Sequence, residues 1–295
     1  MFYSIRITKK MWGGALLAVA LCAAALFAGT RFFPQPEAVG CAAGDLGEPE
    51  AVFTAGAADS GAQDGTTGAE NGGTPEKVVY LTFDDGPSAT TEKVLDVLKA
   101  EGVPGTFFVM ASENNEEHLP LITRAVEEGN MIALHTCSHD YKKIYKSTDA
   151  YWNDLQQLRD KITPYLPTGY EIHWLRFPGG STNTVSHRYG GSSIMKNLKA
   201  QAGDRGFHYA DWNVCADDSL GGHPSASRIL QNIVGDAKGK DTCIVLMHDT
   251  SATKNTAAAL PDIIRWFKNE GYRFDTIDHY KSTKAVEKSP ENKQI

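Results

Sequence analysis

Lysine and arginine are absent from residues 32–76, although this segment carries eight carboxylates and is rich in glycine, alanine and threonine. A chain of this composition cannot bury enough apolar surface to offset the entropy that folding would cost. A folded domain in this segment is therefore excluded. We expect residues 32–76 to form a disordered acidic tether.

An excess of positive charge is also missing. The chain carries a formal charge of −7. Once the eight acidic residues of the tether and the four basic residues before it are set aside, residues 77–295 have a net charge of only −3. A domain so close to neutral lacks the basic surface that nucleic-acid binding requires, so we expect no nucleic-acid partner.

Cysteine is scarce in the second part of the chain. Residues 77–280 contain Cys137, Cys215 and Cys243, and an odd number leaves at least one thiol unpaired. Cys137 and Cys215 each follow an apolar run and could face each other. Two alternatives are open: these two residues form a disulfide, or all three thiols are free.

Residues 11–30 contain no charged side chain and are long enough to cross a bilayer as a helix. Basic residues precede this run and the acidic tether follows it, which places the amino terminus in the cytoplasm and the rest outside. We expect residues 1–31 to be a cytoplasmic stub and a membrane anchor, making the chain a single-pass protein of the cell membrane. A cleaved signal peptide, which would give a secreted protein, is the alternative. A lipoprotein is excluded because Cys22 follows Leu21 and Cys41 lies too far beyond the apolar run.

Residues 77–280 amount to a single domain, followed by a polar tail over residues 281–295. Short apolar runs alternate with helical patterns, which indicates a parallel sheet with helical crossovers. We predict an α/β fold, an irregular (β/α) barrel with seven strands. The strands are expected near residues 78–83, 105–110, 131–134, 174–175, 207–210, 243–247 and 272–277, and the main helices near 91–100, 119–128, 149–162, 192–201, 225–236 and 256–269.

Five of the apolar runs end in polar groups that could carry chemistry. In a barrel of parallel strands, the carboxyl ends of different strands converge on one face, where such folds place catalysis. The sequence therefore predicts a single site. The groups are Asp84-Asp85-Gly86, His135-Thr136-Cys137-Ser138-His139, Arg176-Phe177-Pro178-Gly179-Gly180, Asp211-Trp212 and His248-Asp249.

Each of these groups also has an ordinary structural interpretation. His135 and His139 have a spacing that suits two imidazoles on one metal ion, but surface pairs share it. Thr136 stands where the zincin pattern has glutamate, so a third ligand must come from elsewhere. Asp84 and Asp85 can supply it, or can belong to a plain turn. Their joint occurrence, each after a strand, favours a metal-dependent hydrolytic site.

The same groups resemble the five motifs of the polysaccharide deacetylase family, the NodB-type domain of carbohydrate esterase family four. The resemblance covers about residues 77–278, in the order and spacing of the family. One departure is Gly179, where many members have tyrosine, so any role of that ring is lost. The matching segments are Thr82-Phe83-Asp84-Asp85-Gly86, His135-Thr136-Cys137-Ser138-His139, Arg176-Phe177-Pro178-Gly179, Asp211-Trp212 and Leu246-Met247-His248.

The resemblance implies that Asp85, His135 and His139 hold one divalent metal. We expect zinc, with cobalt, nickel and manganese as alternatives for such a ligand set. Asp84 would take a proton from the attacking water, and Arg176 would hold Asp84 in place and keep it ionised.

It also implies roles for the remaining residues. His248 would protonate the departing amine, with Asp211 as its carboxylate partner. The backbone N–H of Gly179 would meet the oxyanion. Trp212 and Leu246 would line an apolar pocket for the acetyl methyl group.

The implied activity is removal of N-acetyl groups from N-acetylglucosamine in a cell-wall polysaccharide. A catalytic domain tethered outside the membrane would meet peptidoglycan first, so peptidoglycan is the expected substrate. We also expect the protein to be a monomer. Chitin oligomers, another exopolysaccharide and acetyl xylan are alternative substrates. An inactive wall-binding module is the alternative from a different class, although the intact candidate residues speak against it.

Overall fold

A computed structural model describes residues 76–280 of the chain. The expected membrane anchor, nearly all of the tether, and the polar tail from residue 281 lie outside the described residues. Within residues 76–280, no helix is both long and apolar enough to cross a membrane.

The core of the domain is a sheet whose paired strands are all parallel. The strand order is β5-β4-β3-β2-β1-β7-β6, and β8 pairs with β1 beside this path. The predicted irregular (β/α) barrel is confirmed, with one further short strand, β6, that the sequence pattern did not reveal. The strands are β1 (Val78–Asp84), β2 (Thr106–Val109), β3 (Met131–Leu134), β4 (Trp174–Leu175), β5 (His208–Tyr209), β6 (Val214–Cys215), β7 (Thr242–His248) and β8 (Arg273–Asp275).

The sheet curls strongly because its two ends are neighbours in sequence. Strands β5 and β6 lie at opposite ends of the strand order, yet residues 210–213 alone connect them. Five residue steps span at most about 18 Å. The two edges must therefore approach each other, which brings the carboxyl ends of the strands around one mouth.

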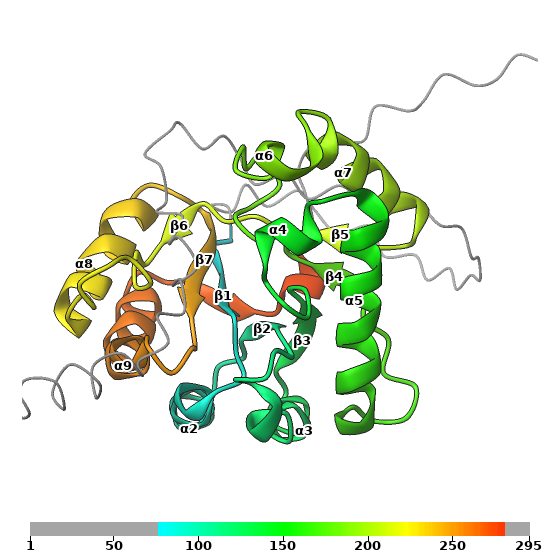
Figure 1. Cartoon of the computed structure of the whole chain (residues 1–295). Helices are drawn as coiled ribbons and strands as arrows, with labels where there is room; N and C mark the ends of the chain where they lie inside the picture. Colours follow the sequence, from blue (N-terminus) through cyan, green and yellow to red (C-terminus); the bar gives the residue numbers. More distant parts are fainter. Residues whose placement is uncertain (1–75, 281–295) are drawn as a thin grey trace, which may run out of the picture. The chain divides into compact units, whose positions relative to one another are not determined.

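Helices surround the outside of this curled sheet (Figure 1). The predicted helices are all present, with ends that differ from the expected ones by at most three residues. They are α2 (Ala89–Glu101), α3 (Leu121–Glu127), α5 (Thr148–Ile162), α7 (Ile194–Asp204), α8 (Ala226–Ala237) and α9 (Lys254–Asn269), joined by the short α4 (Tyr141–Ile144) and α6 (His187–Gly190) and the 3-10 turns η1 (Glu116–His118), η2 (Thr163–Tyr165) and η3 (Ile277–His279).

The side chains of each strand alternate between two separate cores. In β1, Val79, Leu81 and Phe83 belong to the large core under the helices. Val78 and Tyr80 belong to a smaller core inside the curl. The next inward positions are Thr82 and Asp84, so the apolar interior gives way to polar groups toward the mouth. The same alternation brings His135, Arg176 and His248 inward at the ends of their strands.

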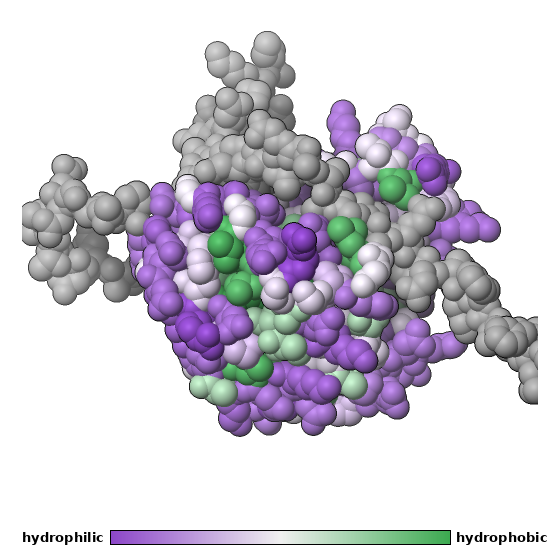
Figure 2. All heavy atoms as spheres, turned by 90° about the vertical axis from the view of Figure 1, so that its left-hand side faces the viewer, coloured by the Kyte–Doolittle hydropathy of each residue, from purple (hydrophilic) through white to green (hydrophobic). Residues whose placement is uncertain are grey.

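The outer surface of the domain is mostly polar. The side near α8 and α9 shows hydrophilic residues with scattered hydrophobic ones (Figure 2). Among the described residues, Tyr189 is the only large hydrophobic side chain classed as exposed, at 39%.

Candidate hydrolytic metal site

The three predicted metal ligands meet at the mouth of the curled sheet. Asp85, His135 and His139 each offer a ligand atom, and these atoms lie within 4.8 Å of one another. Oδ1 of Asp85 is 3.5 Å from Nε2 of His135 and 3.6 Å from Nε2 of His139. Tetrahedral zinc with ligands at 2.0–2.2 Å separates its ligand atoms by about 3.3–3.5 Å. Oδ1 of Asp85 is buried without a hydrogen bond, so the residues fit a cation at this point.

His135 is held in the form that a metal requires. Its Nδ1 lies 2.8 Å from the carbonyl of Arg176, which can only accept, so Nδ1 carries the proton and Nε2 presents its lone pair. Burial lowers the pKa of His135 to about 3 against the opposing charge of Asp85, so the ring is neutral. Neutral imidazole is the ligand form.

The loop between the two histidines, residues 136–138 and called the metal loop below, is held in place by a side chain of α5. The side chain of Asp154, on α5, accepts hydrogen bonds from the backbone N–H groups of Cys137 (2.6 Å) and Ser138 (3.2 Å). Three residues around the site have left-handed backbones: φ is 72° at Asp85, 86° at Thr136 and 51° at His139. Such strain is typical of functional sites, where the surrounding structure maintains it.

Cys137 is a free, buried thiol that donates to the carbonyl of Ala111. The disulfide between Cys137 and Cys215 is therefore not formed. Cys215 is itself disulfide-bonded, so the alternative of three free thiols is wrong as well. The thiol of Cys137 instead packs in the core beneath the metal loop.

Asp84 and Arg176 form a buried ion pair beside the three ligands. Arg176 Nη1 lies 2.8 Å from Oδ1 of Asp84 and also donates to the hydroxyl of Thr82. Its remaining groups donate to the carbonyls of Ala210 and Asp211. Burial raises the pKa of Asp84, and the charge of Arg176 opposes that rise. The arginine thus holds the carboxylate in one orientation and favours its ionised form.

The carboxylate partner of His248 is Asp218, and the expectation of Asp211 in that role is wrong. Oδ1 of Asp218 lies 2.8 Å from Nδ1 of His248, and Oδ2 accepts from the backbone N–H of His248. Burial alone would lower the pKa of His248, but the charge and hydrogen bond of Asp218 outweigh it and raise the pKa to about 10. The imidazole is therefore cationic at neutral pH.

Asp211 instead fixes the loop that carries Gly179. Its two oxygens accept from the backbone N–H (2.8 Å) and the hydroxyl (2.5 Å) of Ser181. The carboxylate holds this loop and is not the partner of His248, because Nδ1 of that imidazole is already paired with Asp218. The N–H of Gly179 donates to no acceptor among the described residues, so it is available to a ligand.

Trp212 and Leu246 lie on the inner side of the sheet. The ring of Trp212 is 5.6 Å from the guanidinium carbon of Arg176 and borders Gly180. Leu246 is buried on β7, one inward position before His248. Both therefore lie near the catalytic candidates, as expected for an apolar wall.

Asp249 joins the two strands that carry the site. Its N–H donates to the carbonyl of Asp84 (3.2 Å), and its own carbonyl accepts from the hydroxyl of Ser88 (2.6 Å). Its side chain accepts from the hydroxyl of Thr91 (2.6 Å). A Cβ atom on Gly86 would lie 2.1 Å from the carboxylate, so glycine is required there. Burial raises the pKa of Asp249 to about 7.

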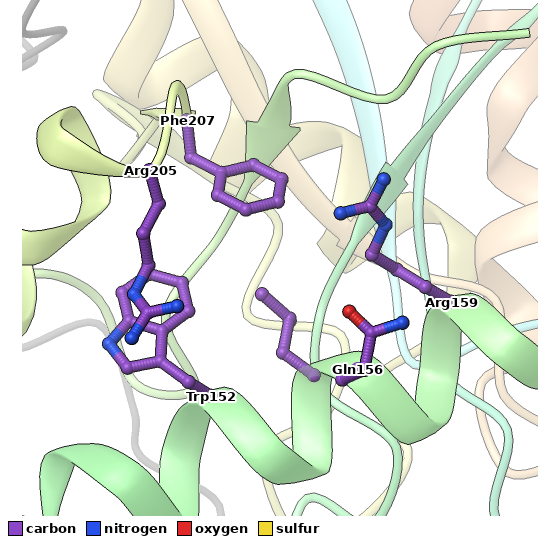
Figure 3. Close-up of a pocket in the computed structure, with 6 residues that line it drawn as sticks. Trp152, Gln156, Arg159, Arg205 and Phe207 are labelled. Carbon is purple, nitrogen blue, oxygen red and sulfur yellow. The ribbon is translucent and has the colours of Figure 1, made fainter.

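A separate hollow of about 220 Å³ lies between α5 and residues 205–207, which connect α7 to β5. Figure 3 shows the guanidinium of Arg205 over the ring of Trp152, with Phe207, Arg159 and Gln156 around the same space. No carboxylate or histidine within residues 76–280 lines it, so this part of the chain provides none of the groups for metal-dependent hydrolysis there.

Sequence reasoning did not identify Asp218. The signal was present, since Asp217-Asp218 comes shortly after Val214-Cys215, much as Asp84-Asp85 stands at the end of β1. A run so short does not stand out as a strand. Asp154 gave no comparable signal because it lies on a helix, and Asp249 stood in the sequence only as the neighbour of His248.

The fold agrees with the comparisons to known proteins. The polysaccharide deacetylase family model matches residues 71–196. A peptidoglycan N-acetylglucosamine deacetylase of Bacillus cereus is 30% identical over 207 residues, which are 69% of this chain and 70% of that protein. The chain belongs to the polysaccharide deacetylase family, the fourth family of carbohydrate esterases, and is a hydrolase of that class.

Two solved structures show the same architecture. The catalytic domain of a peptidoglycan N-acetylglucosamine deacetylase from Eubacterium rectale is 36% identical, with a TM-score of 0.64, over 72% of this chain and 92% of that one. A carbohydrate esterase family four enzyme from Streptococcus mutans is 30% identical, with a TM-score of 0.59, over 68% of this chain and 86% of that one.

Proposed function

We propose that this chain is a zinc-dependent deacetylase that removes N-acetyl groups from N-acetylglucosamine in peptidoglycan. The observation that carries the proposal is the meeting of Asp85, His135 and His139 within 4.8 Å, between the Asp84–Arg176 pair and the Asp218–His248 pair. The substrate is supported by the names of relatives from Bacillus cereus and Eubacterium rectale.

In the proposed reaction, zinc bound by Asp85, His135 and His139 would polarise the acetyl carbonyl and make water more acidic. Asp84 accepts the proton of the attacking water, and Arg176 keeps Asp84 ionised and oriented. His248, kept cationic by Asp218, gives its proton to the amine as the C–N bond breaks. The products are acetate and a free amino sugar.

The test is acetate release from peptidoglycan, chitin oligomers and acetyl xylan by the full chain, before and after removal of metal with a chelator. We expect release from peptidoglycan, loss after chelation and recovery with zinc. Recovery with cobalt, nickel or manganese but not zinc would contradict the choice of metal. Faster release from chitin oligomers or acetyl xylan would reassign the substrate, and no release from any of the three would indicate a binding module instead.

We also propose that residues 11–30 anchor the enzyme in the membrane with the catalytic domain outside, as their lack of charge supports. Amino-terminal sequencing of the native protein should find residues before Arg31. A first residue beyond Arg31 would indicate a cleaved signal peptide and a secreted enzyme. We expect the domain to act as a monomer, because its large apolar side chains are mostly buried.

Replacing Asp218 by asparagine should narrow the pH range of activity from the alkaline side. Because the pKa of His248 is raised from 6.5 to about 10, its ion pair with Asp218 stabilises the fold fully below about pH 6.5. This stabilisation is lost as the pH rises through about 10, where the imidazole gives up its proton. Without the charge of Asp218, burial lowers that pKa, so the cationic acid disappears at a lower pH. We expect kcat/KM at pH 8–9 to fall by about tenfold or more relative to pH 6. An alkaline limb that does not move in Asp218→Asn would contradict this pairing.

A further inference from the structure

The hydroxyl of Tyr141 occupies the space that a side chain at position 179 would fill. A Cβ atom placed on Gly179 would lie 2.6 Å from Oη of Tyr141, closer than such atoms approach in proteins. Gly179 also has a φ of 77°, which other residues adopt only with strain. The two residues are therefore complementary: glycine leaves the opening, and the tyrosine hydroxyl enters it.

The ring of Tyr141 is held firmly in this position. It packs edge-on against the ligand His139, with ring centroids 5.5 Å apart, and against Tyr145 at 5.4 Å. Tyr145 is itself buried and donates to the carbonyl of Pro178 (2.7 Å), one residue before Gly179. The hydroxyl of Tyr141 is thus tied to both the metal loop and the Gly179 loop.

Two hydrogen-bond donors remain unused at this point. Among the described residues, neither the hydroxyl of Tyr141 nor the N–H of Gly179 donates to an acceptor. The hydroxyl is not among the buried polar atoms without a partner, so solvent can reach it. A phenol retains its proton at neutral pH and can donate it.

We propose that Tyr141 is a catalytic residue whose hydroxyl, together with the N–H of Gly179, donates a hydrogen bond to the oxyanion of the tetrahedral intermediate. This inference rests on the proposed deacetylase function. The tyrosine keeps its proton throughout. When water adds to the acetyl carbon, the π electrons move to the carbonyl oxygen, and they return as the C–N bond breaks. The hydrogen bond is stronger to the oxyanion than to the neutral carbonyl, so it lowers the barrier.

Replacing Tyr141 by phenylalanine should lower kcat for acetate release by about 10²-fold, the effect of removing one oxyanion donor. KM and the zinc content per protein should stay unchanged, because the ring remains against His139. Tyr189→Phe, which removes a hydroxyl from an exposed ring, is the control and should retain full activity.

Other outcomes would overturn the inference in recognisable ways. Full activity of Tyr141→Phe would show that the hydroxyl does not take part. A raised KM with unchanged kcat would make it a ground-state binding group, and lost zinc would make it a support of His139. If the wild-type enzyme releases acetate, any of these results overturns only the role of Tyr141. An inactive wild type would overturn both that role and the proposed function.

A stability cycle tests the geometry without any activity measurement. Gly179→Ala should lower Tm in the wild-type background, through backbone strain and the contact with the Tyr141 hydroxyl. In the Tyr141→Phe background the strain remains but the contact is relieved, so the loss in Tm should be smaller. Equal losses in the two backgrounds would show that the hydroxyl does not lie beside position 179.

Discussion

Replacing His139 by alanine is expected to remove both the bound metal and the activity. Only Asp85 and His135 would remain of the three ligands, and two protein ligands hold an ion poorly. The neighbouring ring of Tyr141 would also lose its edge-to-face contact. Acetate release should fall to background, with less than about a tenth of the wild-type zinc retained after dialysis.

The control for this variant is His173→Ala, because the side chain of His173 is 57% exposed, pairs with Glu171 and precedes β4 at the end of that strand opposite to the site. It should keep its metal and its activity. Stoichiometric zinc with full turnover in His139→Ala would show that the ligand assignment is wrong. Metal should be measured by mass spectrometry at a temperature well below the Tm of each variant. Both proteins are then folded, and unfolding is not mistaken for the loss of a ligand.

The second large effect is expected for Asp84→Asn. The amide cannot accept the proton of the attacking water, so kcat should fall by about 10²-fold or more. The metal should remain, since all three ligands are intact. Fold stability should also fall, because Arg176 is fully buried and loses its ionised partner, a change that costs up to about 3–5 kcal/mol. The amide oxygen can still accept from Arg176, which keeps the loss below that limit.

Asp96→Asn provides the matched control, because that carboxylate pairs with Arg124 on the surface and its side chain is 64% exposed. Its turnover and Tm should differ little from those of the wild type. Activity, zinc content and thermal unfolding should be recorded for both variants. Wild-type kcat in folded Asp84→Asn would assign the general base to another group.

The sequence predicted the strands and main helices because their signals are local. Continuous apolar runs such as Cys243–Met247 and the helical stripe of α5 each depend on neighbouring residues, and the structure contains both. The meeting of Asp85, His135 and His139 could be predicted for a related reason. Each follows a strand, and parallel strands end on the same side.

The choice between Asp211 and Asp218 could not be made from the same reasoning. Both carboxylates follow short strands on the same side of the sheet, so strand ends alone do not distinguish them. The difference arises from strand order: β6 pairs with β7, which carries His248, whereas β5 lies at the far end of the sheet. The place of Tyr141 was equally hidden, since it depends on an opening at Gly179, 38 positions along the chain.

The hydrogen bonds of Asp249 hold the carboxyl ends of β1 and β7 together. Asp249 is bonded to the carbonyl of Asp84 and to the first turn of α2, and it directly follows His248. The proposed proton acceptor, Asp84, and the proposed proton donor, His248, therefore lie on two strand ends that these bonds hold together. A substitution in the loops after the other strands can then change what the site contacts without altering the spacing of Asp84 and His248.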